Sequence, residues 1–411
     1  MYHEHETIGD RIGRLRERRG LTQEQLAERA GLCVDTVRKL EQGRRLTARL
    51  ATLNRLAHAL DVETSLLVGR PATFEARRGD GDSPSVLALR RAVAPVGDLL
   101  REEPDPEAPP SLRALQNALR STERIRREGR MGAIGSLLPQ LIEDARAAAR
   151  ALRGEEQRAA HAVLAEAYQV AATTLTALGK EDAAFTAMER ATEAARKSDD
   201  HRLETVGAAT LAWIFTKQGR LEDALHLALR YADRAEPGFR SGPTDLSLWG
   251  VLLLRAATAA VRQGEQQHDR VEELLRMATA AAAAVGADRL DYATPFGPAN
   301  VGVAKVNFLV EMDKSGEAVA SARSVPGLAE LPPTWRARFH VDRALAHTDL
   351  KQDDRAARAL LMAEGDAPEW MRYHATSRRL VSELRSRERR RSSPVTELAN
   401  RLDRAPHPAA G

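Results

Sequence analysis

Apolar positions along this 411-residue chain recur at helical spacing over most of its length. Near the N-terminus, the apolar positions within residues 26–30 share one helical face, and Val37 with Leu40 forms a second stripe of spacing i, i+3. Gly31 lies between the stripes, where its permissive backbone suits a tight turn. This pattern predicts two short helices packed against each other.

The first of these helices has a clear start signal. Thr22 precedes it, and a threonine hydroxyl at this position accepts a hydrogen bond from the free backbone N–H groups of the first turn. The second helix leaves one face uncovered. A helix with such a face fits the major groove of B-form DNA, where polar side chains meet base edges and an apolar one meets a thymine methyl. The alternative is a small solvated helical hairpin without a nucleic-acid partner.

Residues 20–43 resemble the DNA-reading core of the phage Cro and repressor family, the xenobiotic-response-element (XRE) type of helix-turn-helix, and the resemblance extends in register from Ile8 to about Leu67. It implies a five-helix domain that binds a double-stranded DNA operator. The positions that it assigns to reading bases are Val34, Asp35, Arg38 and Lys39. The positions that it assigns to phosphate contacts are Gln23, Thr36, Arg44 and Arg45.

Two departures from the family pattern lie next to the second helix. Cys33 stands where the family usually has a Ser or Thr cap, and residues 46–49 replace the usual Pro-Ser entry to the fourth helix. They bear on the pitch of the recognition helix. Cys33 is interpreted either as a small residue tolerated at a cap or as a redox sensor beside the DNA.

Charge and composition agree with a DNA-binding protein of the cytoplasm. The whole chain carries only +4, but residues 8–70 hold 13 basic and 8 acidic residues, a local balance of +5 that suits phosphate contact. One cysteine is compatible with a reducing compartment, and the alanine-rich residues 278–285 are too short to span a membrane. The heavy use of Arg and Ala is typical of a GC-rich genome, and the domain order resembles regulators of the actinobacterial type.

Signatures of catalysis are missing from the sequence. Gly179 and Lys180 lack the earlier glycine of a phosphate-binding loop, and neither a Gly-x-Ser-x-Gly nor a His-Glu-x-x-His motif occurs. Residues 3–6 (His-Glu-His-Glu) lie at a terminus and would hold a metal only weakly. We therefore expect no enzyme activity, no catalytic residue, no metal and no cofactor.

The domain boundaries follow from changes in composition. Residues 1–70 form the helix-turn-helix domain, and residues 71–110 are a Pro- and Gly-rich linker with a short helix over residues 86–102, kinked at Pro95. Residues 111–390 are helical throughout. Residues 391–411 hold a last helix and a tail, preceded by a basic stretch that either assists DNA binding or ends a solvated helix.

The helical region contains repeats. Gly179 and Gly219 each lie at a turn and are followed five residues later by Ala184 and Ala224, where a second helix must approach the first closely. Weaker echoes occur at Gly264, at Gly316 and at residues 351–354. The glycine intervals of 40, 45 and 52 residues exceed the roughly 34 residues of the tetratricopeptide repeat (TPR), which this pattern resembles. We predict an all-α chain whose second part is a TPR-like solenoid; the alternative is an irregular helical bundle.

Residues 291–308 form the most unusual stretch of the solenoid. Prolines, glycines, aromatics and amides gather there, and Asn300 and Asn307 share a helical face. In peptide-sensing regulators with a similar domain order, asparagines that line the repeat groove hold a peptide backbone. The resemblance implies a ligand groove that includes Tyr292, Phe296, Asn300 and Asn307. Alternatively, the aromatic residues belong to the core and the asparagines are caps.

Two hypotheses about function follow. In the first, the protein is a homodimeric transcriptional regulator whose solenoid mediates dimerisation and senses a peptide, a small molecule or a protein partner. In the second, it is an interaction adaptor whose solenoid binds another protein, with the helix-turn-helix tethering it to DNA. Sequence-selective, salt-dependent binding to a pseudo-palindrome distinguishes the first from the second.

Overall fold

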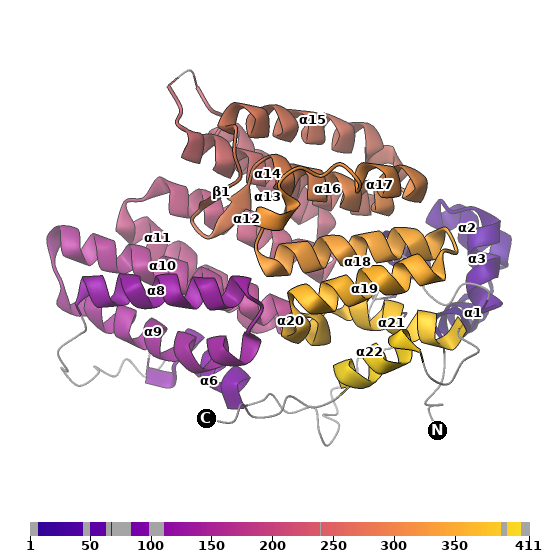
Figure 1. The fold of residues 1–411 in the computed structure, drawn as a ribbon, viewed down its shortest axis with the longest axis horizontal. Coiled ribbons are helices and arrows are strands. Elements are labelled where there is room, and N and C mark those ends of the chain that lie inside the picture. Colours follow the sequence, from indigo (N-terminus) through magenta and orange to yellow (C-terminus); the bar gives the residue numbers. More distant parts are fainter. Residues whose placement is uncertain are drawn as a thin grey trace. The chain divides into compact units, whose positions relative to one another are not determined.

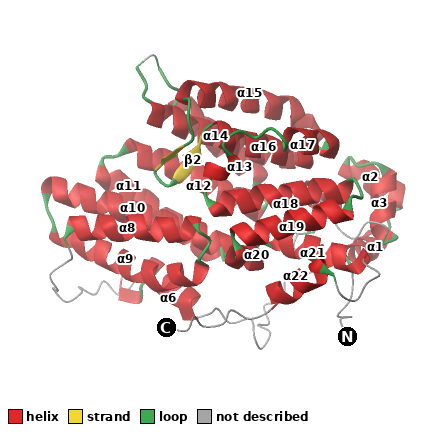
Figure 2. Ribbon diagram, in the orientation of Figure 1, coloured by secondary structure: helices red, strands yellow, loops and turns green. Residues whose placement is uncertain are grey.

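The computed structural model describes residues 7–43, 50–62, 67, 84–97, 111–238, 240–387 and 393–403. These residues are almost all helical, which confirms the all-α prediction, except for a two-stranded ribbon that the sequence did not predict (Figures 1 and 2). The chain divides into two compact units: residues 1–81 with 260–268, and residues 82–259 with 269–411.

The helix-turn-helix unit contains four described helices near the N-terminus. They are α1 (Ile8–Arg18), α2 (Gln23–Ala30), α3 (Val34–Glu41) and α4 (Leu50–Ala59). Their apolar faces meet in one core, which contains the stripes that the sequence predicted: Leu26, Ala27, Ala30, Val37 and Leu40 are all buried there. Residues 1–6 and 44–49, including the His-Glu-His-Glu stretch, lie outside the described residues.

The second unit is a succession of helix pairs. Its helices, together with α14 at the boundary, are α6 (Pro84–Val93), α8 (Leu112–Arg127), α9 (Met131–Ala151), α10 (Gly154–Ala177), α11 (Glu181–Ser198), α12 (His201–Gln218), α13 (Leu221–Arg234), α14 (Pro243–Gln263), α15 (His268–Val285), α16 (Pro298–Glu311), α17 (Ser315–Ser321), α18 (Pro333–Asp349), α19 (Asp353–Asp366), α20 (Pro368–Tyr373), α21 (Ala375–Arg387) and α22 (Pro394–Asp403). Short 3-10 turns occupy Glu265–Gln267 and Leu328–Glu330, and the ribbon strands are β1 (Arg289–Asp291) and β2 (Thr294–Phe296). The pairing of β1 with β2 is antiparallel.

The predicted turn chemistry of the repeats is confirmed at the two strongest positions. Gly179 and Gly219 have positive φ angles of 71° and 80°, and each joins the two helices of a pair. Ala184 and Ala224 are fully buried, because a methyl group is small enough for the second helix to pack closely on the first. The sequence signal and its physical reason therefore agree.

Of the weaker echoes of the repeat, the one at Gly316 was wrong about which residue makes the turn. Gly316 lies inside α17, and Asp313, with φ of 64°, takes the left-handed position instead. The other two echoes do lie at turns: Gly264, with φ of 120°, follows α14, and Lys351, with φ of 58°, lies between α18 and α19. Favourable packing can offset the small free-energy cost of placing one non-glycine residue in the left-handed conformation. Glycine spacing alone therefore does not locate every turn.

The second unit has TPR-like packing, in which each pair covers the apolar face of its neighbour. Helix α10 packs on α9, α11 and α12, and α18 packs on α16, α17 and α19. A repeat pair cannot bury its own apolar faces, so this stacking supplies the core. The result is a helical-repeat unit and not an irregular bundle.

The stack also closes on itself, since its first helices contact its later ones. The Thr334 hydroxyl at the start of α18 donates to the carbonyl of Arg127 at the end of α8 (3.1 Å). The Glu369 carboxylate of α20 accepts from the Gly132 backbone N–H of α9 (2.7 Å). Figure 1 shows α8 and α20 side by side. These contacts restrain the curvature of the unit.

The helix predicted in the linker is part of this unit, and the predicted interruption at Pro95 is confirmed. Helix α6 begins at Pro84 and ends at Val93, because a proline at position 95 disfavours helical geometry in the residue before it. Residues 96–97 are helical again, and residues 98–102 of the predicted helix lie outside the described residues. Its buried residues Val86, Leu89, Ala92 and Val93 belong to the same core as α8 to α12. Most of the remaining linker, residues 68–83 and 98–110, lies outside the described residues.

One described helix, α14, is long and apolar enough to cross a membrane by length and composition alone. Its most apolar window is 67% buried inside the protein, which is the burial of a core helix.

The last helix, predicted near residues 393–403, is confirmed as α22. Residues 388–391 of the preceding basic stretch lie outside the described residues.

Candidate nucleic-acid interface and effector segment

Helix α2 begins and ends as the sequence predicted. The Thr22 hydroxyl accepts from the Gln25 backbone N–H (3.2 Å), and the Gln25 side chain accepts from the Thr22 N–H (2.9 Å), which completes a capping box. Gly31 closes the helix in the left-handed conformation, with φ of 58° and ψ of 39°. Arg55 of α4 then donates to the carbonyl of Ala30 (2.8 Å), so the turn between α2 and α3 is held from outside as well.

Helix α3 is seated on α1 through a close backbone approach. A Cβ atom added at Gly9 would lie only 1.9 Å from the carbonyl oxygen of Leu40. Gly13, one turn later on α1, has ordinary space there, with its nearest neighbour at 3.6 Å. Glycine at position 9 therefore allows the backbone at the end of α3 to approach α1 closely. The helical pattern of the sequence did not reveal this requirement for glycine.

A buried ion pair fixes the end of α3. The Arg16 guanidinium donates to both oxygens of Glu41 (2.8 and 3.0 Å). The Arg16 side chain is 13% exposed and the Glu41 side chain is 8% exposed. The same guanidinium donates to the carbonyl of Leu21 (2.8 Å), just before α2. The hydrogen bond with Glu41 raises the pKa of Arg16, so this guanidinium stays charged. This pair joins α1, the α2 entry and α3.

The predicted base-reading residues lie on the outer side of α3. Asp35, Arg38 and Lys39 are exposed, whereas Val34 is half-buried and packs against the core. Lys39 Nζ lies 2.5 Å from Asp35 Oδ2, with both side chains more than half exposed. Exposed pairs of this kind contribute about 0–1 kcal/mol, so exchanging them for contacts to bases costs little.

A second exposed pair links α3 to α2. Arg38 Nη2 lies 3.7 Å from Glu24 Oε1. Hydrogen bonds from its own backbone N–H and from Thr22 lower the pKa of Glu24, so this carboxylate remains ionised beside Arg38. Because both side chains are about half exposed or more, the guanidinium keeps access to solvent.

The predicted phosphate contacts are less uniform. Gln23 is half-buried and donates to Glu41 Oε2 (2.7 Å), and Thr36 is half-buried on α3. Arg44 and Arg45 lie outside the described residues. The base-reading and phosphate-contact assignments remain predictions.

Several arginines counted in the local basic excess serve the fold. Arg11 donates to the carbonyl of Leu67 (3.0 Å), and Arg19 donates to the carbonyl of Asp61 (3.0 Å). With Arg16 and Arg55, they hold helix ends together. The charge that α3 presents outward is therefore more local than the sequence count indicated.

Residues 288–308 of the second unit form a closely packed corner. Phe296 is fully buried, and its ring lies 2.0 Å from where a Cβ of Gly250 would stand. The Asp288 carboxylate accepts from the backbone N–H groups of Ala299 and Asn300 (3.1 and 3.2 Å) and caps α16. Phe296 thus belongs to the core and has no surface to offer a ligand in this conformation.

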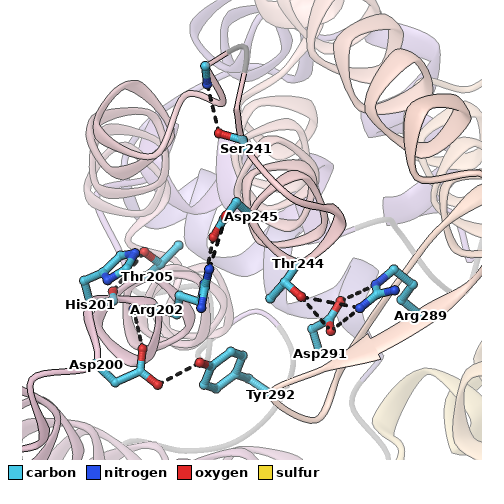
Figure 3. A network of polar contacts seen from close by, with 11 residues as sticks. Asp200, His201, Arg202, Thr205, Ser241, Thr244, Asp245, Arg289, Asp291 and Tyr292 are labelled. Atoms are coloured by element: carbon cyan, nitrogen blue, oxygen red, sulfur yellow. Dashed lines mark hydrogen bonds and ion pairs between the residues drawn. The ribbon is translucent and has the colours of Figure 1, made fainter.

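The turn of the ribbon is backbone-strained and held by polar contacts (Figure 3). Tyr292 and Ala293 have φ angles of 48° and 57°, which glycine or asparagine usually supplies in a two-residue hairpin. The Tyr292 hydroxyl donates to Asp200 Oδ2 of α12 (2.7 Å), and Arg126 of α8 donates to the carbonyl of Ala293 (3.3 Å). Burial and the Asp200 contact raise the pKa of Tyr292.

The two asparagines of the predicted groove are buried on α16. Asn300 is 9% exposed and Asn307 is 8% exposed. Burial raises the pKa of the Asp342 carboxyl group on α18, and the neighbouring Arg338 and Asn307 oppose the rise. Of the four predicted groove residues, only Tyr292 presents a half-exposed side chain. Their contact with a ligand remains a prediction.

Comparison with known proteins places the N-terminal unit. A helix-turn-helix domain family model matches residues 7–67. The immunity repressor protein of Bacillus phage phi105 is 30% identical over 132 residues, which cover 30% of this chain and 91% of the repressor.

Two solved structures resemble the chain more distantly. The complex of Bacillus thuringiensis PlcR with the peptide PapR7 and DNA matches at a TM-score of 0.35 and 13% identity, over 87% of this chain and 99% of that one. The P58(IPK) TPR domain matches at a TM-score of 0.25 and 14% identity, over 90% of this chain and 99% of that one. Scores this low do not establish a common fold for the whole chain.

The cap of α3 gives a first prediction. Cys33 occupies the N-cap position with extended backbone but makes no side-chain cap hydrogen bond. Cys33→Ser should stabilise the helix-turn-helix unit by about 1 kcal/mol, because a serine oxygen can accept from the free N–H groups of the first turn. Chemical denaturation measures the change. Cys33→Ala is the control, and equal stability of both variants would contradict the capping argument.

Proposed function

The chain belongs to the helix-turn-helix repressor family that includes the phage phi105 immunity repressor, and on that premise we propose that it is an effector-responsive regulator that binds its operator as a homodimer. It is a DNA-binding regulator with a TPR-like domain.

The outer face of α3 is the observation that supports the DNA-binding mode. It presents two exposed cations and one carboxylate, Arg38, Lys39 and Asp35, on a short helix that Gly9 and the Arg16–Glu41 pair hold in place. An anchored helix with a polar outer face suits insertion into the major groove, where Arg or Lys pairs with guanine and a carboxylate accepts from cytosine. Half-buried Val34 would contact a thymine methyl at the edge of this face.

A homodimer follows from the small size of this face. One short recognition helix reaches only a few base pairs, and repressors of this type obtain affinity by placing two copies about one helical turn apart. The second unit, with its long helical surface, is the part that would bring two copies together.

An effector site is proposed at the corner of residues 288–308. The strained turn at Tyr292 and Ala293 bridges α8 and α12, next to the contacts that close the helical stack. Backbone strain of this kind is often found at switch regions. A ligand that binds there with different affinity for two curvatures would shift the population of one of them.

The DNA-reading model predicts two classes of variant. Lys39→Ala and Val34→Ala should change which operator sequence is preferred, since base contacts discriminate by about 1–3 kcal/mol. Arg44→Ala should weaken binding to all sequences alike and reduce the salt dependence by about one unit. Selection from a random duplex library, with salt titrations, measures both effects.

The matched control for these variants is Arg276→Ala, which removes an exposed arginine from α15 of the other unit. It should leave sequence preference unchanged. If the α3 variants select the same sites as the wild type, with the same affinity and salt slope, α3 does not read the operator.

The dimer model predicts a dependence on half-site spacing. Inserting about five base pairs between the two half-sites rotates them to opposite faces of the duplex and should weaken binding strongly, whereas about ten should restore much of it. Sedimentation of the full chain should give the mass of a dimer. A monomer whose operator affinity ignores spacing would contradict the model.

The effector model predicts a loss of response without a loss of DNA binding. Asn300→Ala and Asn307→Ala should abolish the change in operator affinity caused by the active fraction of a cell extract or a candidate peptide, a change of roughly 5- to 150-fold. Basal operator affinity should be nearly unchanged. Asn117→Ala on exposed α8 surface is the control.

Effector response and thermal melts together distinguish ligand contact from structural support by these asparagines. If the variants respond to the effector like the wild type, or if they lose several kcal/mol of stability in thermal melts, the asparagines are structural. A protein that responds to no extract and binds the operator only with a partner protein would favour the adaptor hypothesis instead.

A further inference from the structure

A cavity of about 550 Å³ lies among α17, α18 and α19 of the second unit, away from the residue 288–308 corner. Five of its lining residues are basic or titratable: Arg323 just after α17, Arg343 and His347 from α18, and Arg355 and Arg358 from α19. The volume is within the range of pockets that hold small organic ligands. Helical periodicity gives no signal for this cluster, because α18, α19 and the turn after α17 each contribute to it.

The positive charge of this cavity is not balanced by a carboxylate in its lining. The lining contains no acidic residue, and in the described part of the chain no ion pair joins its four arginines to a carboxylate. Two carboxylates of α19 pair elsewhere: Asp353 lies 3.0 Å from Arg387, and Glu364 lies 2.7 Å from Arg401. Four arginines that converge without a counter-charge form a site of positive potential.

The side chains are oriented by neutral partners. Gln352 Oε1 accepts from His347 Nδ1 (2.9 Å) and from Arg355 Nη1 (3.1 Å), since an amide oxygen can only accept. Arg343 lies over the Phe339 ring, with its guanidinium carbon 5.6 Å from the ring centre. These contacts hold two guanidinium groups and the imidazole without neutralising them.

The electrostatic effects on two of these groups agree with this geometry. Burial lowers the pKa of Arg343. Burial also lowers the pKa of His347, with further lowering by Arg343, Arg355 and Arg323, while the Gln352 hydrogen bond opposes it. The three arginines therefore lie close enough to the imidazole to repel a charge on it.

One side of the cavity is apolar. Val319, Ala359 and Met362 line it, and Met362 is 50% exposed. A ligand that fits both sides carries negative charge at one end and an apolar group at the other. A concave site with an apolar wall suits a small molecule better than the convex phosphate backbone of a duplex.

We propose that this cavity binds a small organic dianion, a phosphate ester or a dicarboxylate joined to an apolar group. Guanidinium groups recognise both headgroups with paired, charge-assisted hydrogen bonds. The apolar part of the ligand lies against Val319 and Met362. Binding here does not require the proposed operator or dimer, so it is tested separately from them.

The test uses the full chain and two synthetic probes, phenyl phosphate and phenylmalonate, in isothermal titration calorimetry. Wild-type protein should bind at least one of them with one site per chain. Phenol, which lacks the charge, should not bind. Binding of phenyl phosphate alone identifies a phosphate site, and binding of phenylmalonate alone identifies a dicarboxylate site.

Arg343→Gln and Arg358→Gln should each weaken this binding by about tenfold or more, the loss expected for a hydrogen bond to a charged group. Arg358 is exposed, so its replacement leaves folding intact. Arg196→Gln on α11 removes an equally exposed charge outside the cavity and should bind like the wild type.

Two results would overturn the proposal. One is that wild-type protein binds neither probe. The other is that Arg196→Gln weakens binding as much as the cavity variants, because the effect would then come from overall charge. If the probes do not bind and the cavity variants instead reduce the salt dependence of operator binding, the arginines contact DNA phosphates.

Discussion

Each repeat pair of the second unit has an apolar face that only another pair covers, and this constraint determines most of the structure. Interior pairs are covered by stacking. The first helices meet the later ones through Thr334 with Arg127 and Glu369 with Gly132. Helix α6, in the segment predicted as linker, covers the flank of α9 with its own apolar residues. Any model in which an effector changes curvature must include the loosening of these closing contacts.

The DNA-binding unit meets a different requirement, because a short helix must present side chains at a fixed angle. The helix propensity of eight residues cannot hold α3 in a fixed orientation, since isolated helices of that length are marginal in water. The anchoring comes from the Gly9 approach and the Arg16–Glu41 pair. The residues on the outer face of α3 do not take part in this anchoring. They can therefore be replaced to recognise a different operator without loss of the fold.

Arginine has three separate roles in this chain, and net charge does not distinguish them. Arg11, Arg19 and Arg55 donate to backbone carbonyls at the ends of elements. Arg38 lies exposed on the recognition helix. Arg343 and Arg358 line a cavity that contains no carboxylate. A local excess of +5 therefore identifies a suitable unit for DNA but not the residues that contact it.

The sequence by itself determined the local features. Thr22 and Gly31 set the ends of α2, and Gly179 and Gly219 set two repeat turns, because caps and left-handed turns depend on a few neighbouring residues. Packing decided the rest. It buried Phe296 against Gly250, made Asp313 a turn residue, and brought arginines from α18, α19 and the turn after α17 to one cavity. Such features depend on residues far apart in the chain, and helical periodicity carries no information about which distant faces meet.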